Sequence, residues 1–155
     1  EDFLNFEVRQ GEFHLSELVQ AVSAYYREKL DIMKISFSVG EYTDCLLKGD
    51  LDRSVEVLQN IVENAVKYGD GHEIALSFSR EEDCRLLTVR NTGCTLAQTE
   101  LPHIFESFIR GTNAESVNGS GLGLYICRQL MHKMQGEIFA EIREGQMYVT
   151  VIFPS

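Results

Sequence analysis

The sequence has few basic residues, and this deficit narrows what the chain can bind. It carries 14 Lys and Arg against 24 Asp and Glu, a formal net charge of -10 at pH 7. A surface that follows a nucleic-acid backbone needs clustered cations to displace the counterions of the phosphates. No nucleic-acid partner is therefore expected, and an anionic ligand must be held locally by backbone amides, a metal ion or a few basic side chains.

Cysteines are also scarce, and none of them is spaced for a metal. The four are Cys45, Cys84, Cys94 and Cys127. They form no CxxC pair, so a zinc site is not expected. We expect reduced thiols that pack as small hydrophobic side chains, which is the usual state in the cytosol.

Long apolar segments, low-complexity tracts and internal repeats are missing as well. No hydrophobic run approaches the roughly 20 residues that span a bilayer, and no signal peptide is present. Because the chain opens at Glu1 without a Met, we expect it to be a fragment of a longer protein. Its 155 residues fit one compact domain.

Hydrophobic periodicity and turn residues predict helices interspersed with strand pairs. Helices are expected from Ser16 to about Leu30, from Asp50 to about Tyr68, and from Leu122 to Gln135. Strand pairs are expected at Lys34–Val39 with Cys45–Lys48, Glu73–Ser79 with Arg85–Arg90, and Glu137–Arg143 with Met147–Phe153. The order predicts an α+β fold, a two-layer α/β sandwich whose helices cover one face of a sheet.

The most informative segment is Gly119-Ser120-Gly121-Leu122-Gly123-Leu124, because it runs directly into the last expected helix. Glycines before a helix let backbone N–H groups approach a phosphate, and the helix N-terminus favours an anion. A flexible packing turn would also explain the glycines. We interpret the segment as a phosphate site because of the residues that precede it.

The helix that begins after Asp50 has two faces. Its apolar residues recur at helical spacing: Leu51, Val55, Leu58, Val62 and Ala65. The opposite face carries Glu56, Asn60, Asn64 and Lys67. A solvated face is the usual interpretation of such a stripe, but two asparagines one turn apart oppose helix propensity. Amide oxygens are hard ligands suited to Mg²⁺, so this face predicts a nucleotide-metal site.

Four ordered motifs resemble those of sensor histidine kinases, within the gyrase, heat-shock-chaperone, histidine-kinase and mismatch-repair ATPase superfamily. They are Asn60–Tyr68 for the asparagine box, Val89–Gly93 for the first glycine box, His103–Gly111 for the phenylalanine box and Gly119–Leu124 for the second glycine box. The resemblance spans about Phe13 to Pro154. It implies a catalytic, ATP-binding domain of the Bergerat type, with a mixed, mostly antiparallel sheet.

The same resemblance implies an organisation and partners. Residues 13–155 would be the catalytic domain, and residues 1–12 a connector from a dimerisation and phosphoacceptor domain that the sequence lacks. The domain would be cytoplasmic and monomeric in isolation, in a parent anchored in the inner or plasma membrane. A response regulator would receive the phosphate next.

By resemblance, the asparagine box holds Mg-ATP. Asn64 would ligate Mg²⁺, Asn60 would line the triphosphate site, Lys67 would lie near the phosphates and Tyr68 beside the nucleotide. Two alternatives stay open: Lys67 could be a solvated surface charge, and Tyr68 could be a packing residue at the end of the helix. Hydrolytic relatives have a Glu at the position of Asn60. An amide cannot act as a base on water, which favours phosphotransfer over hydrolysis.

The segment after the phenylalanine box is expected to be a lid. Phe105 and Phe108 would anchor it, although core packing explains their spacing equally well. The lid, Arg110–Gly119, is polar and contains glycine, and Arg110 would meet the γ-phosphate once the Asn113–Asn118 segment closes. A free surface arginine is the alternative. Asn60 and Arg110 are the candidate catalytic residues.

The first glycine box departs from the family pattern. Asn91 stands where the family usually has Asp, beside the retained Gly93, while Thr92 and Thr95 replace its Asn and second Gly. A carboxylate can only accept a hydrogen bond, as the adenine amino group requires. An amide can accept or, if flipped, donate to guanine.

The acceptor histidine is missing. The sequence has four histidines, and none is followed by the family's Glu/Asp-x-x-x-Thr/Asn-Pro pattern, so the chain should not phosphorylate itself. The leading hypothesis is a kinase domain that transfers the γ-phosphate of ATP to a histidine elsewhere. The alternative is a degenerate nucleotide-sensing module without phosphotransfer.

Overall fold

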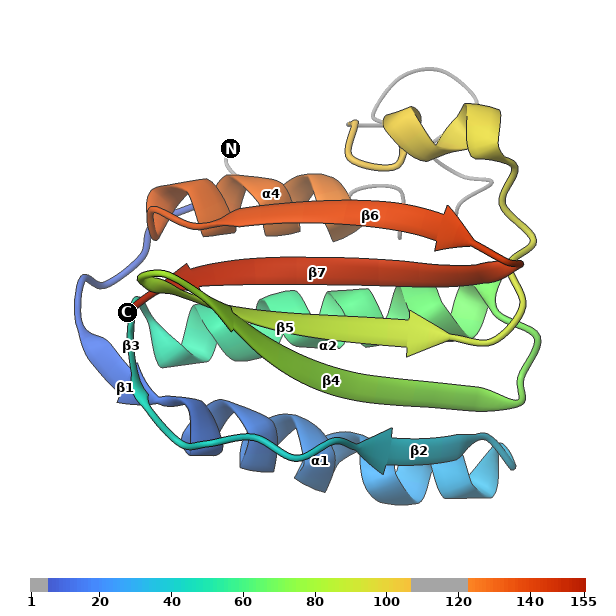
Figure 1. Ribbon diagram of the computed structural model, residues 1–155, viewed down its shortest axis with the longest axis horizontal. Helices are drawn as coiled ribbons and strands as arrows, with labels where there is room; N and C mark the ends of the chain where they lie inside the picture. Colours follow the sequence, from blue (N-terminus) through green and yellow to red (C-terminus); the bar gives the residue numbers. More distant parts are fainter. Residues whose placement is uncertain (1–5, 107–122) are drawn as a thin grey trace.

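The computed structural model describes residues 6–106 and 123–155 (Figure 1). Its helices are α1 (Leu15–Ile32), α2 (Leu51–Tyr68) and α4 (Gly123–Lys133), with a 3₁₀ helix η1 (Gln98–His103). Its strands are β1 (Glu12–His14), β2 (Ser36–Val39), β3 (Leu46–Lys48), β4 (Glu73–Glu81), β5 (Cys84–Asn91), β6 (Glu137–Arg143) and β7 (Gln146–Pro154). None of these helices is long and apolar enough to cross a membrane.

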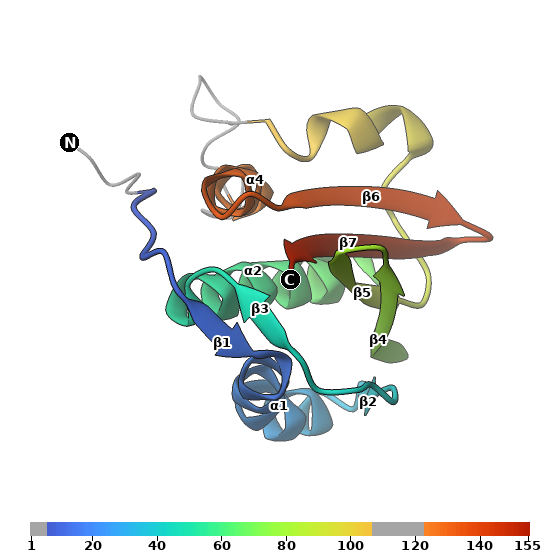
Figure 2. The ribbon, with the colours of Figure 1, turned by 60° about the vertical axis from the view of Figure 1, so that its left-hand side comes forward.

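Five strands form one sheet in the order β2-β4-β5-β7-β6. Strand β2 is parallel to β4, and the other neighbours are antiparallel. Helices α1, α2 and α4 lie on one side of this sheet (Figure 2). The expected two-layer sandwich with a mixed, mostly antiparallel sheet is therefore confirmed.

The pairing expected for Lys34–Val39 with Cys45–Lys48 is wrong. Strand β2 pairs with β4, with Ser36 opposite Glu73, and β3 pairs with β1 in a separate two-stranded sheet. The reason is that β1 buries a side chain against a strand from the other end of the chain. Phe13 on β1 is 4% exposed, and its ring meets that of Phe153 edge-on at a centroid distance of 6.0 Å. Closeness in sequence suggested a hairpin, but the core selects other partners.

Helix α2, which carries the two asparagines, is held by its N-terminal cap and by packing against the sheet and α4. Asp50 caps its N-terminus by accepting a hydrogen bond from the Arg53 amide at 3.1 Å. The middle of its apolar face is buried under the sheet, with Leu58 and Val62 at 0% exposure. Helix α4 packs on another side, where the buried Cys127 thiol lies 3.5 Å from the carbonyl oxygen of Val57.

The segment before β1 lies along the start of α2. The Arg9 amide donates to Asp50 at 2.8 Å, and the Arg53 side chain donates to the carbonyl oxygen of Glu7 at 2.9 Å. The Gly49 amide donates to the carbonyl of Gly11 at 2.8 Å. Residues 7–11 are thus held against the domain by backbone and charged groups.

Candidate functional site

The two asparagines of α2 face the start of α4. Asn64 is only 6% exposed, and its Nδ2 donates to the backbone carbonyl of Asn60 at 2.9 Å. A side-chain carbon at Gly123 would lie 3.4 Å from Asn64 Nδ2 and 3.7 Å from Asn60 Oδ1. The structure therefore brings the asparagine box and the end of the second glycine box together.

The Asn64 side chain is held through its nitrogen. Nδ2 donates within the helix, and among residues 6–106 and 123–155 no hydrogen bond to Oδ1 is found. Within those ranges no group of three or more His, Cys, Asp or Glu could hold a metal ion. A cation at this place would depend on few protein ligands, which is the way Mg²⁺ binds beside substrate phosphates.

Lys67 and Tyr68 are the last two residues of α2. Lys67 is exposed, and its Nζ lies 5.1 Å from the ring centroid of Tyr68. The Tyr68 ring is half-buried and packs against the core. Packing and a nucleotide-facing role for Tyr68 are therefore compatible.

Asn91, at the end of β5, is 2% exposed and has a fixed orientation. Its Nδ2 donates to the carbonyl of Gly93 at 2.7 Å and lies 3.4 Å from that of Thr92. A flipped amide would put its oxygen against two carbonyl oxygens, so the acceptor Oδ1 stays on the other side. A side-chain carbon at Gly69 would lie 3.0 Å from Nδ2, so glycine is needed where α2 ends beside Asn91.

Gly93 belongs to a polar turn that sequence reasoning missed. Its φ is +66°, and a side-chain carbon there would lie 2.7 Å from Asp70 Cβ, so only glycine fits. The Thr92 hydroxyl donates to Asp70 at 2.7 Å, and the His72 amide donates at 3.0 Å. These hydrogen bonds hold the pKa of Asp70 below its ordinary value, and the bond from Thr92 has the largest effect. An Asp two residues before a bonded amide is a turn signal.

Phe105 of the phenylalanine box packs under α4. It is 8% exposed, and the Arg128 guanidinium lies 4.1 Å from its ring centroid. Arg128 Nη2 donates weakly to the carbonyl of Ile138 at 3.5 Å, while its buried Nε has no partner among the residues described. Leu124, at the start of α4, is 2% exposed and belongs to the core. Arg128 was not predicted, since nothing local links it to a ring so far back in the chain.

Several predicted site residues lie outside the described residues. They are Phe108, Arg110, Gly119, Ser120, Gly121 and Leu122. The expected closure of Arg110–Gly119 lies there too. The described part of the site consists of the polar face of α2, the end of β5, Phe105 and the start of α4.

Comparison with known proteins assigns the family. Residues 49–155, more than half of the chain, match the family described as histidine kinase-, DNA gyrase B-, and HSP90-like ATPase. The sensor protein SrrB of Staphylococcus aureus is 25% identical over 140 residues, which are 87% of this chain and 24% of SrrB. The chain thus spans about a quarter of the length of the curated relatives it matches.

Solved structures agree with this assignment. The nucleotide-free catalytic domain of histidine kinase ThkA aligns with a TM-score of 0.81 at 28% identity, covering 94% of this chain and 95% of that domain. ThkA in complex with the response regulator protein TrrA aligns at 0.77 and 27% identity, over 95% of this chain and 42% of that one. The chain belongs to the histidine kinase-, DNA gyrase B- and HSP90-like ATPase family, as an ATP-binding domain of the sensor histidine kinase kind.

Proposed function

We propose that this domain binds Mg-ATP between α2, α4 and the end of β5, and donates the γ-phosphate to a histidine on a dimerisation domain outside this sequence. The observation that carries the proposal is the buried Asn64 side chain, of which, within the described residues, only the nitrogen is used in a hydrogen bond. Its nitrogen is bonded within the helix and its oxygen is free to accept a cation. In return, Mg²⁺ would neutralise charge on the phosphates.

Asn60 supports transfer over hydrolysis. It lies beside Gly123 on the same face as Asn64, where hydrolytic relatives carry a Glu. A neutral amide can position a phosphate or a water, but it cannot remove a proton. The described residues of the site would therefore orient ATP and shield it until an imidazole nucleophile approaches. Arg110 is proposed as the group that meets the γ-phosphate.

Asn91 supports adenine as the base. Because Nδ2 is held by the Gly93 carbonyl, Oδ1 is the atom left to accept a hydrogen bond, and the adenine amino group could donate it, as it would to an aspartate. The same oxygen would face the carbonyl oxygen of guanine and repel it. The alternative of a degenerate sensing module rested on the loss of the carboxylate at this position, and this orientation weakens its support.

The proposal extends to the parent protein. Residues 1–12 would connect this domain to the dimerisation and phosphoacceptor domain, and a response regulator would take the phosphate from that domain. The ThkA complex with TrrA supports the second partner. The parent would be a membrane-anchored sensor with this domain in the cytoplasm.

A melting experiment tests the binding part. Nucleotide at about 100 times its dissociation constant should stabilise the domain by about 2.7 kcal/mol, a shift of about 5–10 °C for a chain of this size. ATP is compared with and without Mg²⁺, and EDTA controls for trace metal. If ATP leaves the melting temperature unchanged both with and without Mg²⁺, the domain does not have this function.

A further inference from the structure

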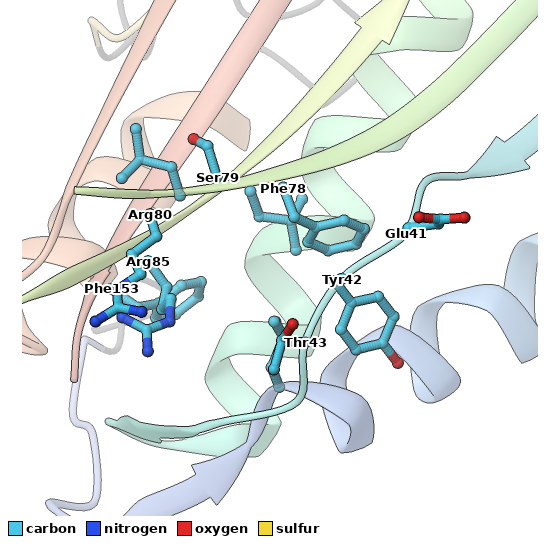
Figure 3. A pocket seen from close by; sticks show the side chains of 11 residues that line it. Glu41, Tyr42, Thr43, Phe78, Ser79, Arg80, Arg85 and Phe153 are labelled. Carbon is cyan, nitrogen blue, oxygen red and sulfur yellow. The ribbon is translucent and has the colours of Figure 1, made fainter.

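A cavity of about 310 Å³ lies at the other end of the sheet from Asn91. Its floor is formed by the helix-side face of β4, β5 and β7, and one wall by residues 41–43, between β2 and β3 (Figure 3). Arg85 and Asn91 lie near opposite ends of β5, so at about 3.4 Å per residue they are about 20 Å apart. The cavity is therefore separate from the candidate nucleotide site.

The half of the cavity near the chain's C-terminus is cationic. Arg80 and Arg85 are directly opposed on β4 and β5, and Arg85 is opposite Phe153 on β7. Opposed residues of an antiparallel pair share a face, and like charges there destabilise the pair. Figure 3 shows the two guanidinium groups next to each other beside the ring of Phe153.

Within the described residues, neither arginine forms an ion pair. Among residues 6–106 and 123–155 no carboxylate lies within ion-pair distance of either one, although the acidic turn 81–83 joins their strands. The Arg85 side chain donates to the Ser155 hydroxyl at 3.4 Å. Glu41 lines the same cavity but points away on its far side (Figure 3). Two adjacent cations with no ion-pair partner in the described part of the chain are unusual in a protein with a net charge of -10.

The other half of the cavity is apolar and aromatic. Phe78 and Leu87 are opposed on the same face as the arginines, and the Tyr42 ring lies 4.8 Å from that of Phe78 at 41°. The volume is at the lower end of the roughly 300–1,000 Å³ found for small-molecule sites. Such a combination offers a flat apolar surface with two fork-shaped donors at one end.

We propose that this cavity binds a small amphiphilic organic anion, with its carboxylate on Arg80 and Arg85 and its apolar body against Phe78 and Tyr42. The carboxylate would place one negative charge between two cations that now repel each other. Arginine is suited to this because its planar donors match both carboxylate oxygens. The inference concerns a second site and does not depend on the function proposed for the first.

The test uses 4-phenylbutyrate as probe and 4-phenylbutanol as its neutral analogue, in ¹⁵N-resolved NMR titrations of the whole chain. We expect the acid to shift the amides of Tyr42, residues 78–80 and residues 85–87, with a dissociation constant on the order of 1 mM. The alcohol should bind about tenfold more weakly, and added salt should reduce this difference.

Two pairs of charge-neutralising substitutions complete the test. R80Q/R85Q should weaken the acid about tenfold and leave the alcohol unchanged. The control R27Q/R143Q removes the same charge from exposed positions elsewhere and should change neither. Y42A, at the rim, should weaken both ligands. The proposal is overturned if acid and alcohol bind alike, if shifts gather at Asn64 and Asn91 instead, or if both double variants lose the acid equally.

Discussion

Replacing Asn91 with Asp restores the residue usual in the family, and yet it should destabilise this domain. Asn91 is 2% exposed, and its Nδ2 donates to the carbonyl of Gly93 at 2.7 Å. A carboxylate would place an acceptor oxygen against that carbonyl and bury a charge beside it.

The magnitude follows from these contacts. Losing the hydrogen bond costs about 1 kcal/mol, and leaving a buried carbonyl facing an anion adds about 1–3 kcal/mol. The total of about 2–4 kcal/mol lowers the melting temperature of a domain this size by about 5–15 °C. Burial would raise the pKa of the new carboxyl group above its unfolded value. The loss should therefore be smallest near pH 4 and grow as the pH rises.

Thermal denaturation of N91D and Q98E, followed by circular dichroism from pH 4 to pH 8, measures this. Gln98 also donates an amide hydrogen bond to a backbone carbonyl, that of Ile142 at 3.0 Å, but it is exposed. Q98E makes the same chemical change in water and should cost no more than about 0.5 kcal/mol. If N91D is as stable as the unaltered domain at pH 7, the orientation assigned to Asn91 is wrong.

Three further changes have defined outcomes. N64A should abolish the magnesium-dependent part of ATP binding, measured by calorimetry with and without EDTA; full retention would refute the ligand role. D70N should lower the melting temperature at pH 7, and this deficit should shrink as the pH falls below about 3.9 and vanish once the pH is below the depressed pKa of the folded state, where Asp70 is protonated. R128M should cost about 1 kcal/mol in urea unfolding by removing the cation from Phe105; an unchanged midpoint would contradict that contact.

Local patterns predicted the elements that carry most of the site. The periodicity of α2 placed Asn60 and Asn64 on one polar face, and the structure keeps them together. The hairpin β6–β7 was predicted as the strand pair Glu137–Arg143 with Met147–Phe153, and in its turn Glu144 and Gly145 both take positive φ angles, +51° and +76°. These features depend on neighbours in the chain, which is why the sequence alone identifies them.

Features set by distant parts of the chain were not predictable. The partner of β2 is a parallel strand more than thirty residues away, with Ser36 opposite Glu73. Long-range packing fixes this pairing, and no local propensity encodes it. The orientation of the Asn91 amide is instead set by the next two residues: the carbonyls of Thr92 and Gly93 accept from its nitrogen, and the residue type alone does not show that the turn brings them there.

Transfer of phosphate tests the central claim most directly. ATP labelled in its γ-phosphate is mixed with a protein that joins this chain to its dimerisation domain, with Mg²⁺ and with EDTA, for the unaltered sequence and N64A. The account predicts an acid-labile, base-stable label on the dimerisation domain, formed only with Mg²⁺ and an intact Asn64. Bound ATP without any transferred label, or labelled inorganic phosphate released in place of phosphohistidine, would contradict it.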